Sequence, residues 1–362
     1  MKFLVTGNMG YVGPSVVKQL RQSYPDATID GVDLAFFAQC LTTRRAIPER
    51  YLDRQIFRDV RGLSEKDLAG YDAVILLAAI SNDPMGERFG DVTFAINRDA
   101  VIQIGHAASR AGVRNLVFAS SCSVYGIAEG GARRECDPVN PLTAYAASKI
   151  GAELGLAEID GDMVITCLRF ATACGMSDRL RLDLVLNDFV ASALTSGRIT
   201  VLSDGSPWRP LIDVADMALA IDWAATRAAD NGGRFLVVNA GADKANYQVR
   251  ELASAVAGAV AGCTVSINEQ APVDSRSYKV DFGLFSKLAP DHLPRISLAT
   301  SITNLVAGLR DIRFADREFR TSALIRLHVL RDFIADGRLS DSFGWVDPMP
   351  GPKPRILEEI HA

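Results

Sequence analysis

Residues 1–13, MKFLVTGNMGYVG, join a short apolar run to a glycine-rich turn. The run at residues 3–5 shows no alternation of apolar and polar side chains, which is typical of a parallel strand buried on both faces. Gly7, Gly10 and Gly13 then follow with the spacing G-x-x-G-x-x-G, and the next segment, VVKQLRQ, has helical spacing. The stretch therefore predicts a strand, a tight turn and a helix in direct succession.

A glycine turn between a strand and a helix N-terminus is suited to hold a pyrophosphate. Glycines let the backbone turn tightly and approach the phosphates, and the helix N-terminus offers unpaired N–H groups and the positive end of its dipole. The alternative is that the three glycines only punctuate an ordinary turn, because a glycine motif alone is weak evidence. Two features described below, Asp33 and the pair Tyr145 and Lys149, favour the pyrophosphate site.

Length and charge exclude several classes of protein. The chain has 362 residues, a length that allows about two domains with a sizeable core. Its net charge is −4. No basic stretch interleaves with aromatic residues, so a nucleic-acid partner is not expected. No apolar run reaches the roughly 18 residues that a membrane-spanning helix needs.

The N-terminus and the cysteines indicate a cytoplasmic protein. The chain begins directly in a strand, without the pattern of a secretory signal. The four histidines lie far apart, so no metal site is expected. Six scattered cysteines without a CxxC pair are interpreted as reduced thiols: Cys40, Cys122, Cys136, Cys167, Cys174 and Cys263.

Strand and helix patterns alternate over the first part of the chain. This alternation predicts a doubly wound parallel sheet of the α/β class. The expected strands are residues 3–6, 28–33, 55–59, 73–79, 115–121 and 164–170, and the clearest helix is residues 92–111.

The pattern changes after residue 175, which predicts a second, smaller α/β lobe that binds the substrate. We expect residues 1–175 to form the cofactor domain, with segments near 205–245 returning to it. Residues 176–204 and 246–316 are assigned to the substrate lobe. Residues 317–362 are expected to form a helical extension that packs on that lobe, because Leu324, Leu327, Leu330 and Phe333 have helical spacing.

Asp33 ends the second predicted strand. In a dinucleotide-binding sheet, a carboxylate at this place accepts hydrogen bonds from the adenosine ribose and repels a 2′-phosphate. The residue therefore favours NAD over NADP, against the alternative of a solvated aspartate at a strand end. Asp59, after the third strand, is expected near the adenine.

Tyr145 and Lys149 form a Y-x-x-x-K pair at a helix start, where positions four apart share a face. A phenol normally titrates near pH 10, so tyrosine is a poor base at neutral pH. A neighbouring ammonium and a positive nicotinamide ring favour the phenolate, which can accept a proton from a sugar hydroxyl. The alternative is a solvated helix face, but Ser121 at the preceding strand end offers a hydroxyl to the same substrate oxygen.

Five motifs together resemble the extended short-chain dehydrogenase/reductase family, in its NAD-dependent sugar-nucleotide epimerase/dehydratase branch. They are TGNMGYVG, Asp33, SSCSVYG, YAASK and SDGSPWRPLIDVADMA, and the resemblance covers roughly residues 1–310. It implies a Rossmann domain, a nucleotide-sugar substrate and a homodimer built on the helices at residues 92–111 and 145–158. It also implies that Tyr145 is the catalytic base, Lys149 its electrostatic partner and Ser121 the hydroxyl on the proton path.

The resemblance extends to the binding residues. It implies that Asn187 and Arg209 hold the substrate diphosphate and that Asp274 and Arg276 lie near its nucleotide. The expected cofactor contacts are Gly7, Met9, Gly10, Tyr11, Gly13, Asp33, Asp59, Val60, Ala78, Ala79, Asn97, Tyr145 and Lys149. The expected substrate contacts are Ser81, Ser121, Ser123, Thr172, Asn187, Arg209, Asp274 and Arg276.

The chain departs from the family pattern at two places. The 4,6-dehydratases carry Asp-Glu directly after the strand-end hydroxyl, and this chain has Cys122 and Ser123 there. A thiol with a pKa near 8.5 is one conceivable acid, but a small strand-end residue is the simpler interpretation. The 4-epimerases usually carry an asparagine after the sixth strand, near the place of Thr172.

The sequence thus predicts an NAD-dependent sugar-nucleotide 4-epimerase that works through a 4-keto intermediate. A 4-dehydrogenase or an atypical dehydratase of the same family is the alternative. A non-catalytic NAD-binding protein is a further alternative, against which the intact pair Tyr145 and Lys149 argues.

Overall fold

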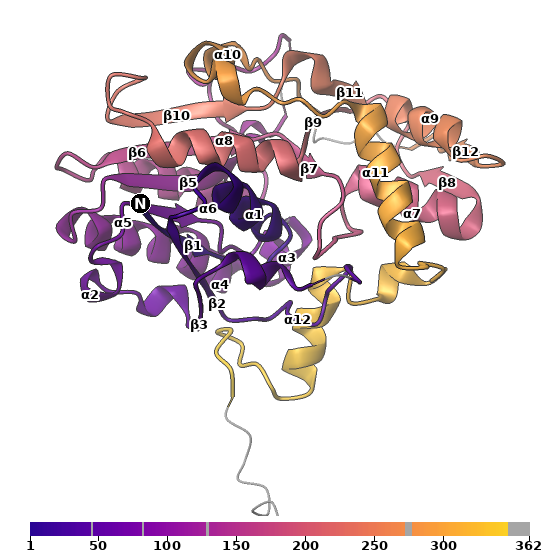
Figure 1. The fold of residues 1–362 in the computed structure, drawn as a ribbon. Helices are drawn as coiled ribbons and strands as arrows, with labels where there is room; N and C mark the ends of the chain where they lie inside the picture. Colours follow the sequence, from indigo (N-terminus) through magenta and orange to yellow (C-terminus); the bar gives the residue numbers. More distant parts are fainter. Residues whose placement is uncertain (45, 82, 128–129, 272–276, 347–362) are drawn as a thin grey trace, which may run out of the picture.

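A seven-stranded parallel sheet forms the centre of the molecule (Figure 1). The computed structural model describes residues 1–44, 46–81, 83–127, 130–271 and 277–346, and the strand order is β10-β6-β5-β4-β1-β2-β3. All neighbouring strands run parallel. The strands are β1 (Lys2–Thr6), β2 (Thr28–Asp33), β3 (Arg54–Phe57), β4 (Ala73–Leu76), β5 (Asn115–Ser121), β6 (Val164–Phe170) and β10 (Phe235–Ala240). The predicted doubly wound α/β sheet is confirmed.

The direction of winding changes between β1 and β4, because the chain adds β2 and β3 on one side of β1 and later strands on the other. A crevice opens at such a switch point, beyond the carboxyl ends of the strands. The fold therefore places a binding site where β1, β2, β4 and β5 end.

Helices cover both faces of this sheet. On one face, Val16 and Leu20 of α1 and Ile221 of α8 share a core with Val5. On the other face, α2, α5 and α6 pack against the opposite side of the same strands. The helices are α1 (Gly13–Ser23), α2 (Glu65–Leu68), α3 (Asp83–Arg88), α4 (Gly90–Phe94), α5 (Ala100–Arg110), α6 (Ala144–Ala157), α7 (Val185–Ser196), α8 (Val214–Thr226), α9 (Val249–Ala259), α10 (Gly283–Leu288), α11 (Leu298–Asp311) and α12 (Arg326–Ala335).

The predicted helix at residues 92–111 contains a wide turn. α4 passes into a π-type turn at Ala95–Asp99 and then into α5. Such turns often mark functional positions, because they redirect a side chain without ending the helix. Here the turn carries Asn97, whose contacts are described below.

Two small sheets lie beyond the main sheet. One has the order β11-β9-β7, and the other pairs β12 with β8 in parallel. The strands are β7 (Thr172–Cys174), β8 (Arg198–Val201), β9 (Trp208–Asp213), β11 (Asn246–Gln248) and β12 (Thr264–Ile267). Helices α7, α9 and α11 pack on these strands and on one another, so they form the second lobe (Figure 1). Between its pieces the chain returns to the main sheet through α8 and β10.

The C-terminal extension leaves the second lobe and crosses to the main sheet. Phe319 packs in the core that includes the second lobe, as expected. The expectation does not hold for α12: Leu330 and Phe333 join the core under the opposite face of the main sheet. Beyond α12, Phe343 is fully buried against the rings of Phe36 and Phe89, at 6.1 and 4.9 Å between centroids. The extension is therefore anchored beside the segment that follows β2.

We expect Phe343→Ala to loosen the extension. Removing a buried phenylalanine typically costs about 3–5 kcal/mol, which corresponds to roughly a 100-fold or larger change in a local opening equilibrium. Amide hydrogen exchange of α12 is the measurement, and it should accelerate by about that factor. The control is Phe57→Ala, since Phe57 is 67% exposed. Equal protection of α12 in wild type and Phe343→Ala would show that the anchor is unimportant.

Candidate active site

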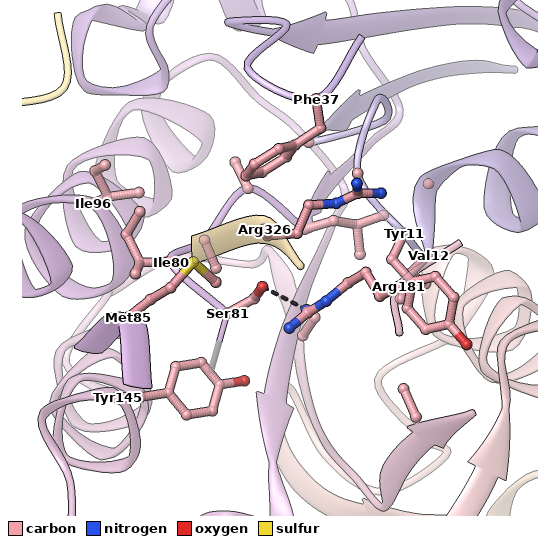
Figure 2. Close-up of a pocket in the computed structure, with 18 of the residues that line it drawn as sticks. Tyr11, Val12, Phe37, Ile80, Ser81, Met85, Ile96, Tyr145, Arg181 and Arg326 are labelled. Carbon is pink, nitrogen blue, oxygen red and sulfur yellow. Dashed lines mark hydrogen bonds between the residues drawn. The ribbon is translucent and has the colours of Figure 1, made fainter. Parts of the chain in front are cut away.

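A cavity of about 310 Å³ lies at the switch point of the sheet (Figure 2). Its walls come from the glycine turn, the segments after β2, β3, β4 and β5, the start of α6, and the C-terminal extension. Side chains from both ends of the chain therefore meet in one site.

The glycine turn has the close backbone approach that the sequence predicts. Gly7 has φ +72°, and a Cβ there would lie 2.5 Å from the amide nitrogen of Ala78. A Cβ on Gly13 would lie 2.2 Å from the carbonyl oxygen of Asn8. At Gly10 a Cβ would meet only the Gly7 carbonyl, at 3.2 Å, and Gly10 lines the cavity. Gly7 and Gly13 thus close the turn, while Gly10 leaves space for a bound group.

α1 starts at this turn without a side-chain cap, since its N-cap residue is Val12. The N–H groups of the first helical turn therefore need another partner, and a phosphate is a suitable one. Val12 and Tyr11 lie along the cavity wall in Figure 2. These features fit the pyrophosphate of a dinucleotide.

Asp33 lies at the end of the cavity formed by the segment after β2. Its carboxylate accepts hydrogen bonds from the backbone N–H groups of Met9, at 3.0 Å, and Ala35, at 2.7 Å. Burial raises the pKa of Asp33, and the two N–H groups oppose that rise. The carboxylate is thus oriented where the sequence places the adenosine ribose.

The remaining predicted cofactor residues divide into two groups. Asp59, Val60, Ala78 and Ala79 line the cavity, although the Asp59 carboxylate is already paired with the Arg61 guanidinium. Asn97 does not line it. Its side-chain oxygen accepts from the Ile80 N–H at 2.8 Å and its nitrogen donates to the Ile80 carbonyl at 2.9 Å. Asn97 therefore shapes the loop after β4 from behind, where a cofactor contact was expected.

Tyr145, Lys149 and Ser121 line the same cavity. The Lys149 ammonium lies 5.6 Å from the centre of the Tyr145 ring and donates to the carbonyl of Ala119 at 2.8 Å. Ser121 ends β5, and its hydroxyl accepts from the N–H of Ser123 at 3.1 Å. The three side chains predicted for proton transfer are therefore brought together by β5 and α6.

Burial lowers the pKa of Lys149 to about 7, and the charge of Glu153 opposes this effect. Glu153 lies one helical turn further along α6. Its carboxylate pairs with the Arg169 guanidinium at 2.7 Å and accepts a hydrogen bond from the Ser120 hydroxyl. This buried pair supports the wall behind Lys149, and the sequence analysis did not single it out.

The expected substrate residues are distributed unevenly. Ser81, Ser123 and Thr172 line the cavity. Asn187 is fully buried: its side-chain nitrogen donates to the Tyr11 hydroxyl and the Arg181 carbonyl, and its oxygen accepts from the Gly175 N–H. These bonds favour a structural role for Asn187 and leave it outside the cavity wall.

Arg209 extends from β9 and donates to the carbonyl of Trp208 at 2.9 Å. It is not among the described residues that line the cavity. Asp274 and Arg276 lie outside the described residues.

Cys122 is not positioned to act as an acid. It is fully buried, its thiol donates to the carbonyl of Arg169, and burial raises its pKa. The interpretation as a small strand-end residue fits this geometry.

Three arginines that the sequence analysis did not assign line the cavity: Arg58, Arg181 and Arg326. Arg58 pairs with Asp67. Arg181 pairs with Asp183 at 2.7 Å and donates to the Ser81 hydroxyl at 2.8 Å (Figure 2). Arg326 comes from α12. No motif in the sequence singles out Arg181, and only the folded chain shows that it points into the site.

Neither a metal-binding cluster nor a membrane-spanning helix is found among the described residues. No group of three or more histidine, cysteine, aspartate or glutamate side chains there is arranged to hold a metal ion. Likewise, none of the helices in the described part of the chain is long and apolar enough to cross a membrane.

Comparison with known proteins places these features in context. Residues 3–241 match the model of the NAD dependent epimerase/dehydratase family. A dTDP-glucose 4,6-dehydratase of Streptomyces griseus is 27% identical over 285 residues, covering 77% of this chain and 85% of that protein. A UDP-glucose 4-epimerase of Mycolicibacterium smegmatis is 27% identical over 268 residues, covering 72% of this chain and 83% of that protein.

Solved structures agree with the sequence relatives. MoeE5 in complex with UDP-glucose and NAD has a TM-score of 0.71 and 26% identity, covering 86% of this chain and 99% of that chain. The NDP-hexosamine 5,6-dehydratase TunA is 21% identical, and the match covers 88% of this chain and 99% of that chain. Its TM-score of 0.73 shows that the two proteins share a fold.

We expect Lys149→Met to change the pH dependence of stability. Lys149 titrates near 7 when folded and near its ordinary value of 10.5 when unfolded. Between these values the unfolded chain binds more protons, so the wild type loses stability as the pH falls from about 10.5 to 7. The free energy of unfolding of Lys149→Met, relative to that of the wild type, should therefore increase as the pH falls from about 10.5 to 7, by up to about 1.4 kcal/mol per pH unit.

Urea unfolding of nucleotide-free protein at pH 7, 8, 9 and 10 is the measurement. The matched substitution Lys18→Met, at an exposed position of α1, controls for the loss of a lysine elsewhere. A difference between Lys149→Met and wild type that is constant over this range would contradict the lowered pKa.

Proposed function

Because the chain belongs to the NAD-dependent epimerase/dehydratase family, an extended short-chain dehydrogenase/reductase family, we propose that it is a sugar-nucleotide 4-epimerase. The family assignment makes it an NAD-dependent enzyme of nucleotide-sugar chemistry. The choice among the reactions of the family is our proposal, since both epimerases and dehydratases are among the relatives.

One observation favours epimerisation over dehydration. Of the described residues that line the cavity, the carboxylates are Asp33 and Asp59, which follow β2 and β3 at the adenosine end. Near Tyr145, the positions after the strand-end Ser121 are held by Cys122 and Ser123. Eliminating water from the sugar requires an acid and a base beside C5 and C6, whereas inverting C4 requires one base. The side chains present are sufficient for the second reaction.

The protein's own groups supply proton transfer and orientation. Tyr145 accepts the proton of the C4 hydroxyl and returns it after the 4-keto sugar has turned its other face. Lys149 favours the phenolate form of Tyr145 through its charge, and Ser121 hydrogen-bonds to the same sugar oxygen. The chemistry that NAD would supply at this site is reversible acceptance of the C4 hydride. The glycine turn and Asp33 bind and orient this cofactor.

The other outcomes differ in their products. A 4-dehydrogenase would release the 4-keto sugar with net formation of NADH, and an atypical dehydratase would release water. The nucleotide-sugar partner, the cytoplasmic location and the homodimer remain predictions. Leu154, 65% exposed on α6, supports the last of these, because an exposed leucine on this helix is suited to an interface with a second copy.

We expect Tyr145→Phe to lower turnover by at least about 100-fold, because it removes the group that transfers the proton. Turnover is measured by mass spectrometry and NMR of products from a panel of UDP-, dTDP-, GDP- and CDP-sugars with NAD. A product of unchanged mass with inverted C4 is the expected result.

The control is Tyr51→Phe, which removes a hydroxyl outside the cavity wall. Loss of two hydrogens from the sugar would instead identify a dehydrogenase, and loss of water a dehydratase. Retention of most turnover in Tyr145→Phe, with inverted product, would exclude Tyr145 as the base.

A further inference from the structure

Arg326 is a buried cation in the cavity wall that the family motifs do not include. It is the first residue of α12, only 1% exposed, and it lies between Phe37 and Arg181 in Figure 2. The family match ends at residue 241, so this side chain comes from outside the matched region.

Arg326 makes no ion pair with any described residue. Its terminal nitrogens donate to three carbonyl groups: Ala323 at 3.0 Å, Arg179 at 2.9 Å and Leu180 at 3.1 Å. Its Nε is buried without a hydrogen-bond partner. The guanidinium also lies over the Phe37 ring, 5.0 Å from its centre.

The neighbouring arginines are already neutralised. Arg179 pairs with Glu49 at 2.6 Å, and Arg181 pairs with Asp183 at 2.7 Å. Burial lowers the pKa of Arg326 to about 10, so the group remains charged at neutral pH. Arg326 is therefore the arginine of this group of three without an ion-pair partner among the described residues, and a buried charge in that state is stabilised when an anion binds.

The position of Arg326 along the cavity indicates which anion it meets. Asp33 marks the ribose end and Tyr145 the reactive end of the cavity. The charge of Arg179 acts on Asp33, and Arg181 interacts with Tyr145. Arg326 donates to the carbonyls of Arg179 and Leu180, so it is held by the segment that joins these two influences. The glycine turn and the uncapped start of α1 form the expected site of the cofactor's phosphates. Arg326 keeps two N–H groups that no carbonyl of a described residue accepts, one on Nε and one on Nη1, and a charged N–H is a strong donor to a phosphate oxygen.

We propose that Arg326 binds the pyrophosphate of NAD and that the C-terminal extension thereby covers the bound cofactor. The inference rests on the NAD dependence of the family and is independent of the sugar reaction. The substrate also carries a diphosphate, so the experiment has to distinguish the two diphosphates.

The anchoring of the extension fits this role. The indole N–H of Trp345 donates to the carbonyl of Leu34 at 2.7 Å, and Arg61 donates to the carbonyl of Ser342 at 2.7 Å. Both contacts lie beside segments that follow β2 and β3, where the adenosine half is expected. The extension thus contributes Arg326 to the cavity wall at the start of α12. Its later residues, 342–345, pack beside the expected adenosine end.

Binding of three probes to Arg326→Gln tests the proposal. ADP-ribose carries the pyrophosphate, adenosine lacks it, and UDP, added with saturating NAD, represents the substrate diphosphate. We expect Arg326→Gln to weaken ADP-ribose binding by about 10- to 100-fold and to leave adenosine binding within about twofold. Copurified NAD, released by denaturation and quantified by chromatography, should fall in parallel.

Arg331→Gln is the matched control, because it removes the same charge from an exposed position of α12. Arg326→Lys keeps the charge without the planar fork and should give an intermediate affinity. Weaker UDP binding with unchanged ADP-ribose binding would overturn the proposal and assign Arg326 to the substrate. Unchanged binding of both UDP and ADP-ribose to Arg326→Gln would overturn the proposal as well.

A second measurement does not depend on the folding of a variant. In wild-type protein, ADP-ribose should slow amide hydrogen exchange in α12, and adenosine should slow it much less. Equal exchange of α12 with and without ADP-ribose would overturn the proposal. None of these binding readouts depends on the sugar product, so a failed epimerase assay and a failed Arg326 test are distinguishable.

Discussion

The close approach between the glycine turn and the loop after β4 is the constraint on which the site depends. At Gly7 the backbone of the turn lies so near Ala78 that a side chain has no space, and the same is true of Gly13 against Asn8. This contact brings the start of α1 to the edge of the sheet where β4 and β5 also end. The polar groups after these strands therefore face one cavity, and helix and strand ends supply most of its binding groups.

Buried charge is arranged differently at the two ends of this cavity. At the reactive end, Lys149 lies in surroundings that disfavour its charge, and the Glu153 carboxylate one turn away is paired with Arg169. The ammonium is therefore sensitive to any new anion or dipole that enters, such as a phenolate or a ribose hydroxyl. Elsewhere in the cavity wall, Arg326 keeps its charge without an ion-pair partner among the described residues. Both groups are cations held by the protein in the cavity wall, which suits a site for an anionic dinucleotide.

The second lobe and the extension give this common fold its particular shape. The chain leaves the main sheet after β6, builds the small sheets, returns through β10, and finally passes to the other face with α12. Because of this path, a single cavity contains groups from the glycine turn after β1 and from α12. Fold alone does not decide among reactions. The distinction between epimerase and dehydratase depends on a few side chains beside Tyr145, where Cys122 is buried and Ser123 faces the cavity.

The sequence by itself determined the parallel sheet, the cofactor and the pair Tyr145 and Lys149, because these depend on local patterns. An apolar run, a glycine spacing or two side chains four apart on a helix act over a few residues and can be recognised without the rest of the chain. Only the tertiary structure decided that Asn97 supports a loop, that Asn187 is bonded inside the protein, and that Arg181 and Arg326 enter the site. Each of these depends on which segments, distant in sequence, become neighbours. The course of the extension is the clearest case: its leucine spacing predicted a helix with a packing face, but which surface it would cover depended on the shape of the whole core.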